Sequence, residues 1–320
     1  MALKSTFRRP SGERAAATVA LCVAAAALLS AIAFAQSPPG KIESAPPPQK
    51  PQQGERPLRV DVNLVLVPVT VTDPYGRLVT GLERENFRIY EDGVEREVLT
   101  VSTEEVPISV GLVFDMSGSM SVQIGTARMA AMQFFRTANP QDEFLMVVFS
   151  SRAQLVSDFT SSLEPLKTRV YYVKAGGLTA LFDALYLGLS RMNEAHHTRR
   201  AIIIISDGED NHSRYTEKDV LNFVKEADVQ LYAVGGFGSQ GWFILNRLTE
   251  LTGGRMFGGG SLEETSSRIW AELRNQYVLS YSPGHTNHDG KWHKIKVKLH
   301  PPRGLPPLEV HARAGYRAPG

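Results

Sequence analysis

Apolar residues follow two different spacings along this chain, and each spacing predicts a different kind of element. Four short runs in the middle of the chain are almost continuously apolar: residues 108–114, 144–149, 201–205 and 229–234. Strands that are buried on both faces, as in a parallel sheet, have this pattern. Between the first two runs, Ile124, Ala127, Ala131 and Phe134 recur at helical spacing. The alternation of strands and helices predicts a doubly wound α/β domain.

Capping signals predict where two later helices begin. Thr216 and Ser261 each start a capping-box sequence, in which a side-chain oxygen can accept a hydrogen bond from the first turn of a helix. We expect the second of these helices to carry Ile269, Leu273 and Tyr277 on one face, because their spacing is helical.

Alternating β-type segments lie on both sides of this α/β region. They occupy residues 58–72, 86–90, 277–281 and 292–299, with turn sequences at 73–76 and 91–93. In the first segment, we expect Val60, Val62 and Leu64 to form the buried face. Strands at both ends favour one β-sandwich that the α/β domain interrupts. Two unrelated β extensions would give the same pattern.

The first residues predict an export signal. A basic stretch through Arg14 precedes an uncharged, alanine-rich run that ends in Ala33-Phe34-Ala35, a typical cleavage pattern. An uncleaved membrane anchor is the alternative, because the run is long enough to span a bilayer. The predicted organisation is a signal peptide at 1–35, a Pro/Gln-rich linker at 36–57, an N-terminal β region at 58–106, the α/β domain at 107–277 and a C-terminal β region at 278–320.

Charge and cysteine content exclude several classes of function. The chain of 320 residues has 35 basic and 33 acidic side chains, and residues 1–35 hold four of the basic and one of the acidic ones. The remainder therefore has 31 basic and 32 acidic side chains, a net charge of −1, which argues against nucleic acid as a partner. A single cysteine can form neither an internal disulfide nor a thiolate cluster.

Oxygen-bearing side chains follow the ends of the apolar runs. They are Asp115, Ser117 and Ser119 after the first run, Asp207 after the third, and Thr179 before a helix. Loops at the carboxyl ends of parallel strands share one edge of a sheet, so we expect these five residues to converge. Such hard oxygen donors suit Mg²⁺ or Mn²⁺, with Ca²⁺ as a further candidate. Two carboxylates leave the ion able to accept another carboxylate from outside.

Four further residues are candidates for the rim of this metal site. They are Gly118, Glu209, Asp210 and Asn211.

At these residues the sequence resembles the von Willebrand factor A domain. The segments DMSGSM, GGLTALFDAL and ISDGEDN match the metal-ion-dependent adhesion site of that family, and the flanking β segments are similar to the bacterial VWFA-related family of acidobacterial type. The resemblance implies a mostly parallel, six-stranded sheet between helices. It also implies that Ser117, Ser119 and Thr179 bind the metal directly or nearly so. Asp115 and Asp207 would bind it directly or through water, and an acidic side chain of a protein ligand would complete the coordination.

We therefore expect an exported, non-enzymatic adhesion module that is located in the bacterial periplasm or on the cell surface, or is secreted. Contact with a membrane is expected only if the N-terminal segment is not cleaved. A metal-dependent hydrolase of the cell envelope, with Asp142 or Asp210 as the general base, is one alternative. A structural envelope protein in which the metal only stabilises the loops is another. The glycine-rich motif at 236–241 matches a dinucleotide-binding pattern, but the next strand lacks the required acidic residue, which favours a simple strand-to-helix loop.

Overall fold

A computed structural model describes six ranges of the chain: residues 64–103, 106–235, 241–258, 261–284, 289–302 and 304–319. Every described residue belongs to one compact unit, Val60–Gly320. The predicted signal peptide and linker therefore lie outside the described residues. Within these six ranges, no helix is both long and apolar enough to cross a membrane.

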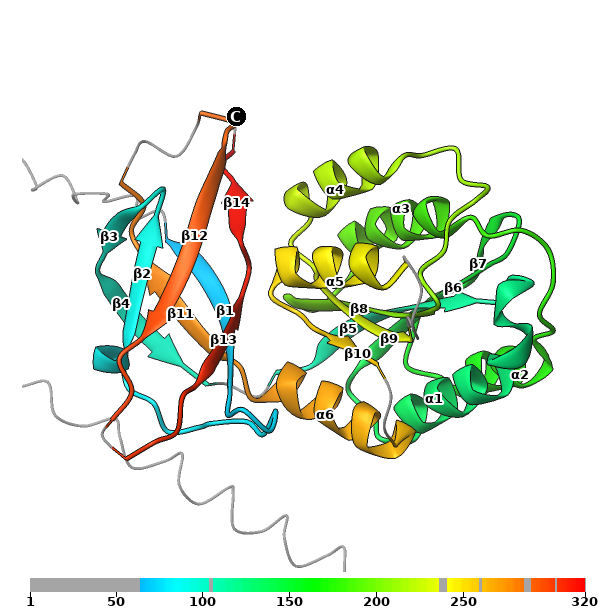
Figure 1. The fold of residues 1–320 in the computed structure, drawn as a ribbon, viewed down its shortest axis with the longest axis horizontal. Coiled ribbons are helices and arrows are strands. Elements are labelled where there is room, and N and C mark those ends of the chain that lie inside the picture. The colour runs from blue at the N-terminus through cyan, green and yellow to red at the C-terminus, as the bar shows by residue number, and fades with distance from the viewer. Residues whose placement is uncertain are drawn as a thin grey trace, which may run out of the picture. The chain divides into compact units, whose positions relative to one another are not determined.

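A six-stranded sheet forms the centre of the α/β domain (Figure 1). Its order is β10 (Met256–Phe257), β9 (Gln230–Gly235), β8 (Arg199–Ser206), β5 (Ile108–Asp115), β6 (Glu143–Phe149) and β7 (Ala153–Thr160). All neighbouring pairs are parallel except β6 and β7. The four apolar runs are β5, β6, β8 and β9, so the predicted mostly parallel sheet is confirmed.

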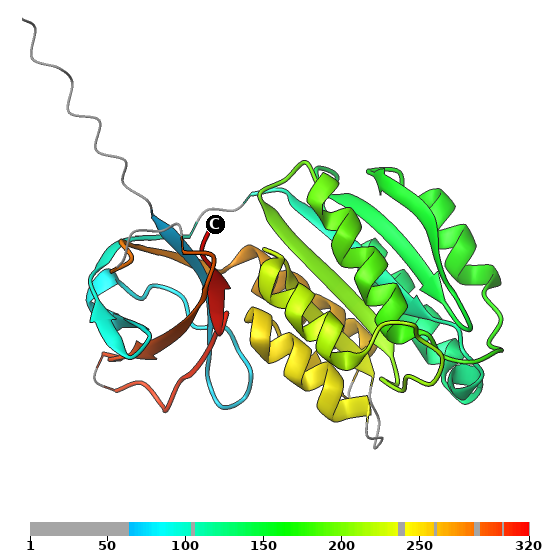
Figure 2. The same cartoon turned by 90° about the horizontal axis from the view of Figure 1, so that it is seen from above.

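Helices cover both faces of the sheet, as a doubly wound fold requires. They are α1 (Ile124–Arg136), α2 (Glu164–Tyr172), α3 (Leu181–Arg191), α4 (Glu217–Glu226), α5 (Gly241–Thr252) and α6 (Leu262–Arg274), with short 3-10 helices η1 (Arg84–Asn86), η2 (Ser119–Val122) and η3 (Met192–Glu194). One apolar core joins the sheet to α1, α2 and α6, and a second joins it to α3, α4 and α5. In the view from above, the latter three helices lie in front of the sheet and run roughly along its strands (Figure 2).

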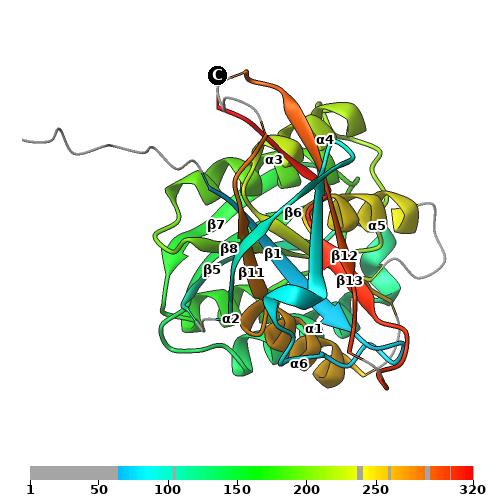
Figure 3. The ribbon, with the colours of Figure 1, turned by 90° about the vertical axis from the view of Figure 1, so that its left-hand side faces the viewer.

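Strands from both ends of the described chain share two antiparallel sheets. The strands are β1 (Val65–Thr72), β2 (Phe87–Glu91), β3 (Val94–Arg96), β4 (Val98–Ser102), β11 (Tyr277–Tyr281), β12 (Trp292–Leu299), β13 (Glu309–Ala312) and β14 (Gly315–Arg317). One sheet has the order β13-β1-β11-β4 and the other β14-β12-β2-β3, with an apolar core between them. Figure 3 shows these strands from the side of the sandwich. This pairing of N-terminal with C-terminal strands is the interrupted sandwich that the sequence favoured.

Two expectations about this region are wrong. In β1 the buried apolar side chains are Val67, Val69 and Val71, whereas Leu64 is 46% exposed. Val60 and Val62 lie outside the described residues. Both sets of alternate positions are apolar around Leu64, so the sequence pattern could not determine which set faces the core. Tyr277 begins β11 and does not belong to α6, which ends at Arg274.

The sandwich contacts the amino-terminal ends of the central strands. The Gln276 amide nitrogen lies 2.9 Å from Gln230 Oε1 at the start of β9 and 3.3 Å from Thr70 Oγ1 in β1. Arg313, which follows β13, forms a 2.7 Å ion pair with Asp228 just before β9. The opposite, carboxyl-terminal edge of the sheet therefore points away from these contacts.

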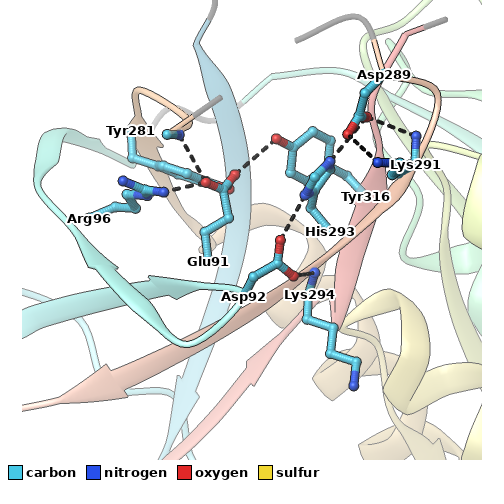
Figure 4. A network of polar contacts seen from close by, with 10 residues as sticks. Glu91, Asp92, Arg96, Tyr281, Asp289, Lys291, His293, Lys294 and Tyr316 are labelled. Carbon is cyan, nitrogen blue, oxygen red and sulfur yellow. Dashed lines mark hydrogen bonds and ion pairs between the residues drawn. The ribbon is translucent and has the colours of Figure 1, made fainter. Parts of the chain in front are cut away.

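One buried carboxylate joins the two sheets of the sandwich (Figure 4). Glu91 Oε1 accepts hydrogen bonds of 3.0 Å from the hydroxyls of both Tyr281 and Tyr316. Its Oε2 accepts from the Gly284 amide at 3.0 Å and from Arg96 Nε at 3.2 Å. These groups come from β2, β3, β11 and β14, so the carboxylate connects strands from both ends of the sequence.

A histidine lies between two carboxylates beside this network (Figure 4). The ring of His293 is 2.8 Å from Asp92 Oδ2 and 3.2 Å from Asp289 Oδ1. Burial lowers the pKa of His293, but the hydrogen bonds and charges of Asp92 and Asp289 outweigh it and raise the pKa above its ordinary value. His293 therefore holds its proton more tightly in the folded sandwich than in the unfolded chain.

The stability contributed by His293 should consequently depend on pH. It should be complete below the ordinary pKa of 6.5 and should disappear as the pH rises through the folded value. We predict that His293→Asn lowers the free energy of unfolding at acidic pH and that the difference from wild type narrows towards alkaline pH. Urea denaturation over a series of pH values measures this difference.

His311→Asn is a matched control with the opposite trend. Burial, together with the charge of Arg255, lowers the pKa of His311 to about 4. The wild type must therefore lose stability through His311 as the pH falls below 6.5, and the substitution should relieve that loss. Parallel pH curves for wild type and His293→Asn would contradict the assignment.

Candidate functional site

Asp115 ends the central strand β5, and all eight residues of this strand are buried. Its Oδ1 accepts a 2.8 Å hydrogen bond from the Ser117 amide, and its Oδ2 accepts one of 2.6 Å from the Ser206 hydroxyl. Burial raises the pKa of Asp115 to about 6 against the effect of these hydrogen bonds, and the charge of Asp207 raises it further. The carboxylate is thus fixed in a place where additional positive charge would stabilise it.

The two serines after Asp115 lie together at the start of η2. Ser117 is fully buried, and its hydroxyl is 3.0 Å from that of Ser119. The Gly118 amide between them donates a 2.9 Å hydrogen bond to the Gly177 carbonyl, which connects this loop to the loop before α3. A Cβ at Gly118 would lie 3.0 Å from that carbonyl oxygen, so the close approach depends on glycine.

Thr179 is held by the loop after β8. Its amide donates to Asn211 Oδ1 at 2.9 Å, and its carbonyl accepts from the amides of Asn211 and His212 at 3.0 and 2.9 Å. Asp210 Oδ2 accepts a 3.1 Å hydrogen bond from the Phe182 amide in the first turn of α3. Asp210 and Asn211 therefore orient the Thr179 loop and the start of α3.

Asp207 directly follows β8 and is almost fully buried. Its Oδ1 accepts a 3.1 Å hydrogen bond from the amide of Glu209, whose side chain is exposed. Gly208 has a φ of +83°, and a Cβ there would lie 2.4 Å from the carbonyl oxygen of Gly241, the first residue of α5. The backbone of this loop thus packs directly against the start of α5.

The structure brings the three predicted loops to one edge of the sheet. Hydrogen bonds connect the loop of Ser117 and Ser119 to the Thr179 loop, and the Thr179 loop to the one that follows β8. Among the predicted rim residues, Gly118 connects loops and Glu209 is exposed, whereas the side chains of Asp210 and Asn211 are engaged with Phe182 and Thr179.

Asp142 lies at the wrong edge for the catalytic role that the sequence left open. It accepts a 3.1 Å hydrogen bond from the Ile108 amide at the start of β5 and forms a 2.9 Å ion pair with Arg274. At roughly 3.3 Å per residue, the length of β5 separates it from Asp115 by about 20 Å. The expectation of Asp142 as a general base is therefore wrong.

Ser206 is a site residue to which sequence reasoning gave no role. Besides donating to Asp115, its hydroxyl accepts a 3.0 Å hydrogen bond from the Gly208 amide. Phe114 pairs with Ile205 in the parallel ladder, so the next residues along the two strands are Asp115 and Ser206. Strand register was the signal that could have identified Ser206.

The donor set of this edge fits a hard cation. Within the described ranges, no three His, Cys, Asp or Glu side chains form a group that could hold a metal. The converging residues instead offer two carboxylates and three hydroxyls, which are ligands that suit Mg²⁺ and not zinc. The pKa of Asp115 is raised mainly because the carboxylate is buried, with a smaller contribution from the charge of Asp207, so a nearby cation would stabilise its charged form.

Residues 110–209 match the family model of the von Willebrand factor type A domain. This segment belongs to the von Willebrand factor type A (VWA) family. An uncharacterized protein of Borreliella burgdorferi is 23% identical over 145 residues, which cover 44% of this chain and 42% of that protein. Human inter-alpha-trypsin inhibitor heavy chain H4 is 26% identical over 148 residues, which cover 42% of this chain and 16% of that protein. The chain thus spans less than half the length of these curated relatives.

Solved structures also resemble this chain. A von Willebrand factor type A structure from Catenulispora acidiphila is 13% identical, with a TM-score of 0.48, and the match covers 80% of this chain and 75% of the other.

The close packing of Gly208 in the VWA domain generates a prediction about stability. Gly208→Ala should lower the free energy of unfolding by at least about 2 kcal/mol, because a side chain at positive φ is strained and its Cβ would clash with Gly241. Chemical denaturation measures this change.

Gly125→Ala is the matched control for this substitution. Gly125 lies in the first turn of α1, and a Cβ there would meet nothing within 4 Å. Its stability should be unchanged or raised by up to about 1 kcal/mol, since alanine favours helix. Equal stability of the two variants would show that the Gly208 contact does not constrain the loop.

Proposed function

We propose that this VWA domain binds a divalent cation of the Mg²⁺ type and uses it to capture a carboxylate of a protein ligand. The ligands of the cation would be Asp115, Ser117, Ser119, Thr179 and Asp207. VWA domains generally act as protein-interaction modules, which supports the proposal. The observation that carries it is the convergence of two buried carboxylates with serine and threonine hydroxyls at one sheet edge.

The chain prepares this edge for a cation before any ligand arrives. Hydrogen bonds from Ser206 and Ser117 fix both oxygens of Asp115, so its carboxylate need not reorganise. The hydroxyls of Ser117 and Ser119 are already 3.0 Å apart and contribute no charge. A bound divalent ion would supply an electrophilic centre here. Neutral hydroxyls would leave that centre able to attract an external carboxylate.

We further propose that the protein is exported, as the sequence of residues 1–35 indicates. The chain would then present the metal edge outside the cytoplasm, with the sandwich at the other end of the VWA strands. N-terminal sequencing of the protein from envelope and culture fractions tests this, and Gln36 as the first residue would support cleavage after Ala35.

The two candidate bases of the hydrolase alternative make other contacts in the structure. Asp142 lies at the far edge of the sheet, and Asp210 already accepts hydrogen bonds from Phe182 and Ser213. Mechanistically, hydrolysis would need a base beside the attacking water. A binding role requires only the metal ligands and an approach for the partner.

Metal binding by the purified protein gives a direct test. We predict that Mg²⁺ raises the free energy of unfolding of the wild type by about 2.7 kcal/mol at a hundredfold excess over its dissociation constant. Asp207→Asn and Ser117→Ala should abolish this gain, because each removes a proposed ligand. Titration calorimetry in parallel measures the binding itself.

Asp158→Asn provides the control for a change of charge alone. Asp158 lies on the edge strand β7, and its side chain is 54% exposed. This variant should retain the full response to Mg²⁺. A wild type that does not respond, or Asp207→Asn and Ser117→Ala variants that respond as strongly as wild type, would overturn the proposed site.

A further inference from the structure

Four large apolar side chains are exposed on the segments that form the metal edge. We call them the apolar collar: Val122, Leu178, Trp242 and Phe243, which are 92%, 48%, 39% and 70% exposed. Val122 and Leu178 lie within three residues of a proposed ligand, and Trp242 and Phe243 follow Gly241, which packs on Gly208.

Val122 and Leu178 belong to the loops that hold the proposed ligands. Val122 is the last residue of η2, which begins at Ser119. Leu178 directly precedes Thr179, and its amide donates a 2.9 Å hydrogen bond to Ser151 Oγ after β6. The backbone of Leu178 is therefore fixed, although its side chain is exposed.

Trp242 and Phe243 reach the same edge through α5. They follow Gly241, where a Cβ would lie only 2.2 Å from the carbonyl carbon of Gly208. The first turn of α5 thus packs on the residue after Asp207. The two rings are perpendicular, with centroids 5.4 Å apart, and form one exposed aromatic surface.

Exposed basic side chains accompany this apolar surface. Arg152 lies in the turn after β6, next to the serine that holds Leu178, and Lys174 lies in the loop between α2 and Gly176. Both are exposed, as is the acidic Glu209 after Asp207. A partner that suits the collar therefore combines apolar surface with negative charge. Exposed apolar surface rimmed by polar groups is typical of a protein-binding site.

We propose that the apolar collar docks a protein segment in which an Asp or Glu side chain has an aromatic or large aliphatic neighbour. The inference rests on the proposed function, because the acidic side chain would be the one that reaches the cation. The collar would bury the neighbouring apolar side chain, and burial of aromatic anchors dominates the affinity of many protein interfaces. The ligand's carboxylate would make binding depend on the metal, and the collar would make some acidic ligands bind more tightly than others.

A library of short random peptides, displayed on phage, tests this sequence preference. The purified protein is incubated with the library in Mg²⁺, and bound phage are eluted with EDTA. We expect the eluted peptides to be enriched in Asp or Glu next to Trp, Phe, Leu or Ile. Enrichment of acidic residues without apolar neighbours would overturn the collar and leave the metal site intact.

Variants of the collar then test the surface itself. With a peptide from this selection, Trp242→Ser/Phe243→Ser should bind at least about tenfold more weakly than wild type. Its response to Mg²⁺ should be unchanged, because neither residue is a proposed ligand. Phe243→Ser alone replaces the double variant if the latter does not fold. Tyr75→Ser, which removes an aromatic residue 75% exposed on the sandwich turn, should bind the peptide like wild type.

The remaining outcomes separate the two proposals. If the wild type does not bind Mg²⁺, the proposed function fails, and the inference fails with it. If Mg²⁺ binds but the collar variants keep their affinity for the peptide, only the collar is wrong. If the collar substitutions instead abolish binding to lipid vesicles or self-association, the apolar surface serves a membrane or a second copy, which also overturns the proposal.

Discussion

The fixed position of the Asp115 carboxylate at the buried end of β5 is the constraint on which the functional edge depends. Strands β6 and β8 pair with β5 on both sides, so the backbone that carries this carboxylate is fixed at the end of the sheet. Ser206 on β8 and the Ser117 amide hold its two oxygens. Burial raises the pKa of this carboxylate, so a cation placed beside it would stabilise its charged form.

The surrounding loops depend on each other as well as on this strand. Gly118 donates to Gly177, and the Thr179 backbone is bound to Asn211. Gly208 packs against Gly241, so α5 is part of the same assembly. The proposed metal ligands and the exposed apolar residues thus lie on segments that the same backbone contacts hold together. The sandwich contacts the other end of the strands, so it does not cover the edge that we propose for binding.

The sequence predicted features that depend on local composition and failed where distant contacts decide. Continuous apolar runs located the central strands, and the hydroxyls and carboxylates at their ends predicted which loops meet at one edge of the sheet. The sequence could not predict which alternate residues of β1 face the core, because both sets are apolar near Leu64. The pairing with neighbouring strands determines which set is buried. Tyr277 has helical spacing to Leu273, but its hydroxyl bonds with Val79 and Leu82 in the sandwich. The role of Ser206 could be predicted only from the register of β5 and β8. The position of Asp142 could be predicted only by knowing at which end of β5 it lies.

A crystal of the protein soaked in Mn²⁺ tests the central claim most directly, because the anomalous signal of the ion gives its position without assumptions. We predict one strong anomalous peak among the side-chain oxygens of Asp115, Ser117, Ser119, Thr179 and Asp207. Distances to the directly coordinated oxygens should be close to those typical of such ions, about 2.0–2.2 Å. Ordered loops without a peak at saturating Mn²⁺, or a peak only at another place, would contradict a metal-binding edge in this VWA domain.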